Sequence, residues 1–252
     1  MQRSAESNRV LITGSTRGIG LAIARAFLAR GDRVFINGRD AAQVSAVIAD
    51  LGENAAGLAA DVTMIEGANQ LTSACVAAFG GIDILVCNVG SGSSVPPGKE
   101  TAEAWQKALT LNLFSTTNMV EAATSALVDS RGAIVCISSI CGVEVIPGAP
   151  VTYSAAKAAL NAFVRGIARP LGKSGVRINA IAPGNILFDG SVWGRKLRED
   201  AVAVQAMLDE NVALGRLGEP DDVAQLAVYL ASEQARFSTG SVWTLDGGQV
   251  RS

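Results

Sequence analysis

The stretch Thr13-Gly14-Ser15-Thr16-Arg17-Gly18-Ile19-Gly20 follows the apolar run Arg9–Ile12 and leads directly into a segment of helical period. In a strand–turn–helix unit, the first glycine permits a tight turn, the second lets the backbone approach a bound group, and the third lets the helix pack against the strand. The free N–H groups at the helix start attract an anion. A glycine triplet alone could be a turn without a ligand, but in this context it predicts a pyrophosphate-binding turn formed by residues 14–20.

Apolar runs alternate with helical segments along the rest of the chain, and the first six runs lack polar alternation, as in strands buried on both faces of a parallel sheet. The expected strands are Arg9–Ile12, Arg33–Asn37, Ala55–Ala60, Ile84–Cys87, Ala133–Ser138, Arg177–Ala182 and Val242–Leu245. The expected helices are Ile19–Ala29, Ala41–Leu51, Ile65–Phe79, Ala102–Leu127, Tyr153–Gly172, Arg195–Asn211 and Asp221–Ala231. This alternation predicts an α/β protein: a single domain over residues 1–252 with a doubly wound Rossmann fold and a mainly parallel, seven-stranded sheet flanked by helices.

Composition excludes several classes of protein. Of 252 residues, 49% are hydrophobic and 17% are charged, which is too apolar for a disordered chain. The formal net charge of −2 provides no basic surface for nucleic acid. No apolar run approaches the roughly 20 residues that span a bilayer. The start, Met1–Asn8, is polar and has no secretory signal, so we expect a cytoplasmic location and no membrane partner.

The chain contains no histidine, which excludes a Ser-His-Asp hydrolase, histidine acid/base chemistry and a histidine-ligated metal. Its four cysteines, Cys75, Cys87, Cys136 and Cys141, form no Cys-x-x-Cys pair and are best interpreted as buried, reduced thiols. We therefore expect no metal site, and any chemistry must use hydroxyls, lysines, carboxylates or a bound cofactor.

The end of the second strand distinguishes between two dinucleotides. A carboxylate there usually holds a free ribose 2′-OH, whereas a 2′-phosphate needs a cation. The sequence reads Asn37-Gly38-Arg39-Asp40, so Arg39, aided by Arg17, favours NADP over NAD. In the alternative interpretation, Arg39 is a solvated surface charge. Asp40 can cap the next helix, and this role is compatible with either NAD or NADP.

Asp61 and Val62 end the third strand, where the carboxylate could accept a hydrogen bond from an adenine amino group. Asp61 could equally cap the helix that follows.

A second motif, Tyr153-Ser154-Ala155-Ala156-Lys157, opens a long alanine-rich helix and places Tyr153 and Lys157 on one face, one turn apart. The run Ser138-Ser139-Ile140-Cys141-Gly142 closes the fifth strand, so a serine hydroxyl can meet the tyrosine at the carboxyl edge of the sheet. A free tyrosine has a pKa of about 10, and bringing it near 7 requires about 4 kcal/mol. A partly desolvated Lys157 ammonium, together with an oxidised nicotinamide ring, could supply this energy.

These motifs, with Asn88-Val89-Gly90 after the fourth strand and Pro183-Gly184 after the sixth, resemble the short-chain dehydrogenase/reductase family in order and spacing from Val10 to Gly248. The resemblance implies that Tyr153 is the general acid/base, that Lys157 lowers its pKa and holds the nicotinamide ribose, and that Ser139 orients the substrate oxygen. It also implies that Asn112 completes a catalytic tetrad. Further cofactor contacts are expected from Asn37, Arg39, Asp61, Val62, Asn88, Gly90, Tyr153, Lys157, Pro183, Gly184 and Ile186.

The sequence departs from the family pattern at three positions. Cys87 replaces an asparagine that stabilises the sheet in many members, and Phe188 stands where many members have a threonine that holds the nicotinamide amide. Backbone groups near Ile186 would then have to hold that amide. Pro170 lies inside the long helix, where it removes a hydrogen bond, so we expect a kink or an early end.

Residues of about 185–215 form the least regular stretch and are predicted to be a substrate lid, although an ordinary surface insertion would look similar. Its apolar residues could line a pocket over the nicotinamide or simply pack together: Phe188, Trp193, Leu197, Met207 and Leu208. Its basic residues could meet an acidic carrier protein or a phosphate, and we favour a solvated helix face: Arg195, Lys196 and Arg198.

The helix from Tyr153 is apolar around most of its circumference, so we expect a homodimer or homotetramer to cover it. The sequence as a whole predicts an NADP-dependent oxidoreductase that moves a hydride between the nicotinamide and a carbonyl or secondary alcohol of a small molecule. One alternative is a 3-oxoacyl-[acyl-carrier-protein] reductase of fatty acid synthesis. The non-enzymatic alternative is a protein of the same fold that binds and senses the cofactor.

Overall fold

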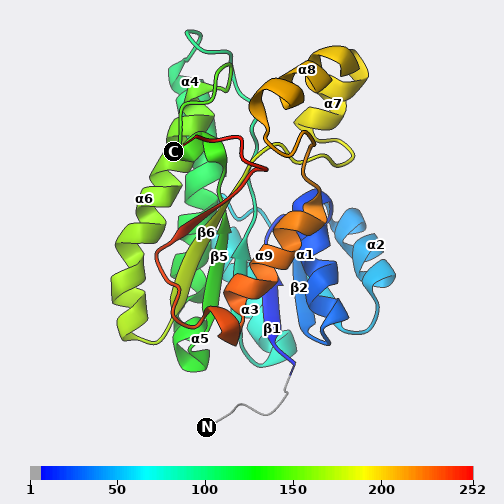
Figure 1. Ribbon diagram of the computed structural model, residues 1–252. Helices are drawn as coiled ribbons and strands as arrows, with labels where there is room; N and C mark the ends of the chain where they lie inside the picture. Colours follow the sequence, from blue (N-terminus) through cyan, green and yellow to red (C-terminus); the bar gives the residue numbers. More distant parts are fainter. Residues whose placement is uncertain (1–6, 252) are drawn as a thin grey trace.

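Seven parallel strands form one sheet in the order β3-β2-β1-β4-β5-β6-β7 in the computed structural model, which describes residues 7–251 (Figure 1). The strands are β1 (Arg9–Ile12), β2 (Arg33–Gly38), β3 (Ala55–Ala59), β4 (Ile84–Cys87), β5 (Ala133–Ile137), β6 (Arg177–Pro183) and β7 (Val242–Leu245). The predicted strands are confirmed to within a residue at each end. The strand order reverses between β1 and β4, and in such sheets ligands bind in the crevice beyond the carboxyl ends of the strands.

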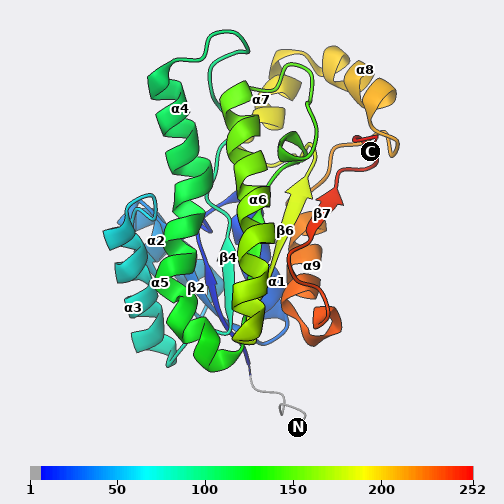
Figure 2. The ribbon, with the colours of Figure 1, turned by 90° about the vertical axis from the view of Figure 1, so that its left-hand side faces the viewer.

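Helices cover both faces of the sheet, as a doubly wound fold requires (Figures 1 and 2). One hydrophobic core lies between the sheet and α3, α5 and α6, and the other lies beneath α1, α2 and α9. The helices are α1 (Gly18–Ala29), α2 (Ala41–Leu51), α3 (Ile65–Phe79), α4 (Ala102–Leu109), α5 (Ser115–Ser130), α6 (Val151–Lys173), α7 (Val192–Glu199), α8 (Ala201–Asn211) and α9 (Pro220–Ala231), with the short 3₁₀ turns η2 (Ile140–Gly142) and η3 (Glu233–Ala235).

The predicted helix Ala102–Leu127 is interrupted by a π-helical turn, η1 (Thr110–Phe114), between α4 and α5. A π turn is rarely stable unless other contacts support it, and such turns often mark functional sites. Asn112 lies inside this turn and is buried.

Two helices, and not the predicted single helix Arg195–Asn211, form most of the predicted lid, and the name lid is kept for residues 185–215. α7 ends at Glu199, and the Asp200 carboxylate accepts a hydrogen bond from Ala203 N at 2.9 Å to cap α8. Both helices lie beyond the carboxyl ends of the strands, at the top of Figure 1. Apolar residues of the two helices and of the loop after α8 pack together in a separate small core, which favours the packing interpretation: Trp193, Leu197, Val204, Met207, Leu208, Val212 and Leu217.

Of the two outcomes expected at Pro170, a kink or an early end of α6, the early end is wrong, because the helix continues to Lys173. Proline removes the N–H that would reach the carbonyl of Gly166, four residues earlier. Both Gly166 and Pro170 are exposed, so water can satisfy that carbonyl.

No helix within residues 7–251 is long and apolar enough to cross a bilayer. Residues 1–6, which carry most of the polar start Met1–Asn8, lie outside the described residues. All four cysteines are free thiols; three of them are buried, and Cys141 is half-buried.

Candidate active site

The glycine turn between β1 and α1 has the backbone conformation that the sequence predicts. Gly14 and Gly18 have φ angles of +59° and +56°, in the left-handed region that favours glycine. A Cβ atom on Gly20 would lie 2.5 Å from Gly14 O, so a side chain there would break the contact between helix and turn. No side chain caps the start of α1, which leaves its first N–H groups available to an anion. These residues fit a dinucleotide pyrophosphate.

Three polar side chains expected at the cofactor instead hold the turn in place. Ser15 Oγ donates to Ile12 O at 2.7 Å and accepts from Asn37 N at 2.9 Å. Asn37 Nδ2 donates to Ala60 O at 3.1 Å, and Asn88 Nδ2 donates to Gly14 O at 2.9 Å. These bonds give the three side chains a structural role in the turn, and their predicted contact with a cofactor stays a prediction.

At the end of β2, Arg39 is exposed and forms no ion pair with a carboxylate of the described residues. The Asp40 carboxylate accepts from Gln43 N at 2.9 Å and caps α2, which confirms the capping interpretation. Thr16 Oγ1 donates to Gln43 Oε1 at 3.1 Å and thereby joins the glycine turn to α2. Sequence reasoning missed Gln43, although its position three residues after a capping aspartate was a signal.

Arg17 extends toward the lid. A Cβ on Gly190 would lie 3.3 Å from the Arg17 Nη1 atom, so the guanidinium sits beside the segment that leads into α7. This contact joins the glycine turn to the lid.

Asp61 forms a tight local turn after β3. Its Oδ1 atom accepts from Thr63 N at 3.0 Å and from Thr63 Oγ1 at 2.7 Å. The residue at the start of α3 is Met64, so the interpretation of Asp61 as the cap of that helix is wrong. Val62 is buried in the core, so only its backbone could contact a cofactor.

Tyr153 and Ser139 meet beyond the carboxyl end of β5. Ser139 begins η2, and its hydroxyl accepts from Cys141 N at 3.2 Å. Burial raises the pKa of Tyr153 to about 12, although the neighbouring Ser139 hydroxyl acts to lower it. The predicted lowering of this pKa required Lys157 together with an oxidised nicotinamide ring, so it stays a prediction for the protein with cofactor bound. The phenol keeps its proton at neutral pH, which suits a general acid.

Lys157 and Asn112 converge on Gly90. A Cβ on Gly90 would lie 3.1 Å from Lys157 Nζ and 2.8 Å from Asn112 Oδ1, so only glycine leaves room for both side chains. Lys157 Nζ donates to Ile137 O at 2.8 Å. Asn112 Oδ1 accepts from Ser91 N at 2.9 Å, and its Nδ2 donates to Ala108 O at 3.1 Å. The bond to Ser91 ties the π turn to the loop after β4, and the bond to Ala108 ties it to α4.

Burial lowers the pKa of Lys157 to about 8, and the thiols of Cys136 and Cys87 raise it by smaller amounts. The two cysteines pair in register on β5 and β4, on the sheet face that α6 covers. Cys87, the departure from the family's asparagine, is thus part of a buried, apolar floor beneath α6.

Pro183 and Gly184 place the chain at the carboxyl edge of β6. Gly184 N donates to Leu245 O at 2.9 Å, and a Cβ on Gly184 would lie 2.8 Å from the Asp246 Cβ, so glycine permits close packing with the end of β7. Ile186 pairs with Gly218 in an isolated bridge, which anchors the start of the lid.

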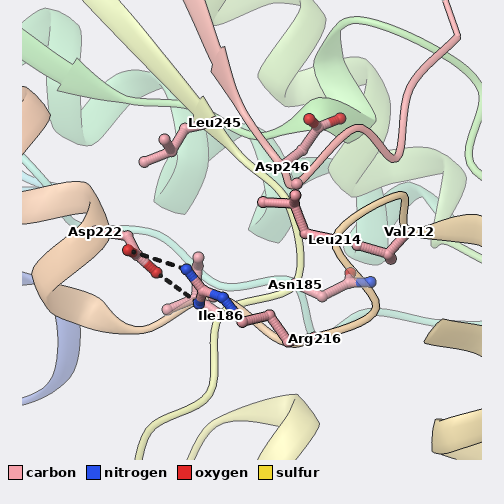
Figure 3. A pocket seen from close by; sticks show the side chains of 10 residues that line it. Asn185, Ile186, Val212, Leu214, Arg216, Asp222, Leu245 and Asp246 are labelled. Carbon is pink, nitrogen blue, oxygen red and sulfur yellow. Dashed lines mark hydrogen bonds and ion pairs between the residues drawn. The ribbon is translucent and has the colours of Figure 1, made fainter. Parts of the chain in front are cut away.

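A pocket lies beside this anchor, between the lid base, the loop before α9 and the end of β7 (Figure 3). The Arg216–Asp222 ion pair, at 3.1 Å, spans one side of it. None of the predicted catalytic side chains lines this pocket.

The predicted absence of a metal site is not contradicted: within residues 7–251, no group of three or more Cys, Asp or Glu side chains is arranged to hold an ion.

The sheet order, the glycine turn and the Ser139–Tyr153–Lys157 cluster at one sheet edge define a dinucleotide-binding α/β protein. A family model described as enoyl-(acyl carrier protein) reductase matches residues 14–249. The chain is 32% identical to 3β-hydroxysteroid dehydrogenase 1 of Eggerthella lenta, over 99% of this chain and 96% of that enzyme. It is 33% identical to the 3-oxoacyl-[acyl-carrier-protein] reductase of Chlamydia muridarum, over 95% of this chain and 96% of that enzyme.

Among solved structures, L-sorbose reductase of Gluconobacter frateurii, complexed with NADPH and L-sorbose, superposes with a TM-score of 0.91 at 30% identity and covers 100% of both chains. The chain belongs to the short-chain dehydrogenase/reductase family and is an oxidoreductase of that family.

Proposed function

We propose that this protein is an NADP-dependent oxidoreductase that transfers a hydride between the nicotinamide and a carbonyl or secondary alcohol carbon of a small molecule. The observation that carries the proposal is the placement of Tyr153 beside Ser139, one helical turn from Lys157 and at the same sheet edge as the glycine turn. The bound cofactor supplies the hydride. The protein groups supply proton transfer and orientation.

In the direction of carbonyl reduction, the Tyr153 hydroxyl donates its proton to the substrate oxygen as that oxygen gains negative charge. Ser139 Oγ donates a hydrogen bond to the same oxygen and fixes its position next to the phenol. Lys157 is held by Ile137 O, one helical turn from Tyr153, and while it is protonated its positive charge stabilises the tyrosinate that remains. Asn112 Oδ1 lies on the same side of Gly90 as the lysine amine and completes the polar cluster there.

The preference for NADP rests on Arg39 and Asp40. Asp40 is committed to the cap of α2 and is poorly placed to accept a ribose hydroxyl, whereas the exposed Arg39 guanidinium is free of carboxylate partners among the described residues. An arginine without a carboxylate partner can form paired hydrogen bonds with a 2′-phosphate. The NADPH complex of the related L-sorbose reductase agrees with this choice.

The relatives do not point to one class of substrate, because they act on chemically different molecules. Their names describe a hydroxysteroid, an acyl thioester on a carrier protein and the sugar L-sorbose. The proposal is tested with a panel of ketones that contains these three types and small aliphatic ketones. Consumption of NADPH and of NADH is measured for each member. We expect turnover of at least one ketone with NADPH preferred.

The panel also separates the alternatives. Activity confined to a 3-oxoacyl thioester would support the carrier-protein reductase, and activity on other ketones without it would exclude that enzyme. Tight NADPH binding without turnover of any member would contradict the proposed reaction and support a cofactor-sensing protein. The assembly into a homodimer or homotetramer stays a proposal, which sedimentation of the purified protein can test.

A further inference from the structure

Asn161 lies on α6, four residues after Lys157 and eight after Tyr153. Residues at this spacing lie on one face of a helix, so Asn161 extends the stripe that the proposed catalytic pair begins. Its exposed fraction is 1%, and because a buried amide is costly without partners, its contacts inside the protein define what it does.

The Asn161 side chain bridges α6 to both ends of the segment that carries Ser139. Ser138 Oγ donates to Asn161 Oδ1 at 2.6 Å, and Asn161 Nδ2 donates to Gly142 O at 2.9 Å. The Gly142 carbonyl can only accept, so the amide nitrogen must face it and the amide oxygen must face Ser138. Both polar ends of the side chain are thereby used.

Two further contacts attach the same segment to α6. Lys157 Nζ donates to Ile137 O, just before Ser138. A Cβ on Gly142 would lie 2.6 Å from the carbonyl carbon of Lys157, so the Gly142 backbone rests directly on the helix. Ser139 is therefore held in a short span whose two flanks are fastened to the helix that carries Tyr153.

We propose that Asn161 is a positioning residue that fixes the Ser139 hydroxyl against Tyr153. This inference rests on the proposed function of Ser139 and Tyr153. Without the Asn161 amide, the Ser138 hydroxyl and the Gly142 carbonyl lose their partner inside the protein, and the span between them is free to shift. A shift of about 1 Å in a catalytic group can cost on the order of 100-fold in rate.

The structure contains a matched control. Asn179, on β6, also has an exposed fraction of 1%. Its Nδ2 donates to Ser238 O at 2.9 Å, and its Oδ1 accepts from Ser241 N at 3.1 Å. These partners lie in the connection to β7 and not among the proposed catalytic residues. Asn179→Ala therefore removes a comparable buried amide without touching Ser139.

The first test compares the kinetics of Asn161→Ala and Asn179→Ala. We expect Asn161→Ala to lower kcat at least about tenfold while the Kd for NADPH changes less than about twofold, since the contribution of an aligned proton-transfer group is about 100-fold or more. Asn179→Ala should keep kcat within about twofold per folded molecule. Equal losses of kcat in the two variants would overturn the proposal.

A second readout does not depend on turnover. The chain has two tyrosines, so NMR of isotope-labelled tyrosine gives two ring signals, which Tyr229→Phe assigns. We expect the Tyr153 signal to shift in Asn161→Ala, because the neighbouring Ser139 hydroxyl moves, and to stay in place in Asn179→Ala. An unchanged Tyr153 signal in Asn161→Ala would overturn the inference even if the protein proves to have no enzymatic activity.

If Asn161→Ala does not fold, Ser138→Ala removes one of the two bridging bonds at lower cost and is measured in the same way. We expect the same direction of change in kcat and in the Tyr153 signal. A Ser138→Ala variant that matches the parent in both would overturn the proposal. Failure of the parent to reduce any ketone would count against the proposed function, and only the NMR comparison would then bear on Asn161.

Discussion

The ring of Phe188 lies against Gly18. A Cβ placed on Gly18 would be 2.6 Å from Phe188 Cε2. The lid thus touches the glycine turn through the residue that departs from the family's threonine, and Phe188 also packs against the core beneath α1 and α9. The contact couples the position of the lid to the place where a pyrophosphate would approach the backbone.

The first prediction concerns Gly18→Ala. Alanine at a φ of +56° costs about 1–2 kcal/mol, and its Cβ would also displace the Phe188 ring. We expect the thermal midpoint to fall and the Kd for NADPH to rise about tenfold or more, as measured by calorimetry. Gly98→Ala is the control, because its φ of +82° imposes similar strain with no atom within 4 Å. The double variant Gly18→Ala/Phe188→Ala should recover part of the loss. If Gly18→Ala and Gly98→Ala change the thermal midpoint and the Kd for NADPH equally, the contact between Phe188 and Gly18 contributes to neither stability nor cofactor binding.

The second prediction concerns Tyr153→Phe. Removing the hydroxyl deletes the proposed proton donor and leaves the ring in place. We expect loss of ketone reduction by at least about 100-fold, with the Kd for NADPH within a few fold of the parent. Single-turnover kinetics with NADPH and a ketone identified from the panel measure the chemical step. Parent-like turnover in this variant would refute the role assigned to Tyr153.

The third prediction concerns Arg39→Glu. A carboxylate at this position would repel a 2′-phosphate and could accept a hydrogen bond from a free 2′-OH. We expect NADPH binding to weaken far more than NADH binding, as measured by fluorescence titration of both cofactors. Arg236→Glu controls for the change in net charge, since this exposed arginine follows η3, at the amino-terminal edge of the sheet. Equal weakening of NADPH and NADH binding would show that Arg39 does not bind the 2′-phosphate.

The fourth prediction concerns the stability of Lys157→Met as a function of pH. The folded protein holds the pKa of Lys157 at about 8, below the value of about 10.4 in an unfolded chain. Below pH 8 both states carry the proton, and burial of the ammonium costs about 3 kcal/mol. Methionine avoids that cost but loses the hydrogen bond to Ile137 O, worth about 1 kcal/mol. We expect Lys157→Met to be more stable at pH 7 by about 2 kcal/mol.

The sign of the pH dependence follows from the same values. Between about pH 8 and 10.4 the unfolded chain binds more protons than the folded protein, so the parent gains stability as the pH rises and the advantage of Lys157→Met shrinks. Denaturant unfolding at several pH values measures this, with the exposed Lys173→Met as a control that should show no such trend. If the stability of Lys157→Met relative to the parent increased with pH, this would contradict the interpretation that a buried Lys157 ammonium destabilises the fold.

Much of the fold could be read from local patterns. The apolar runs buried on both faces, the helical period between them and the glycine turn after β1 predicted the strands, their parallel arrangement and the edge where the site lies. Tyr153 and Lys157 could be paired because helical spacing alone places them on one face. The capping role of Asp40 followed from its position before α2.

The remaining features depend on contacts between segments far apart in the chain. The π turn at Asn112 coincides with hydrogen bonds to Ser91 and Ala108. No periodic pattern of residues in the sequence predicts this turn. The raised pKa of Tyr153 reflects burial, and the bridge from Asn161 to Ser138 and Gly142 needs β5 and α6 packed together. Sequence alone therefore determined which elements form and which residues can react, because propensity and periodicity are local. Tertiary structure decided how polar atoms are partnered and how charges are desolvated, because both depend on neighbours that only the folded chain assembles.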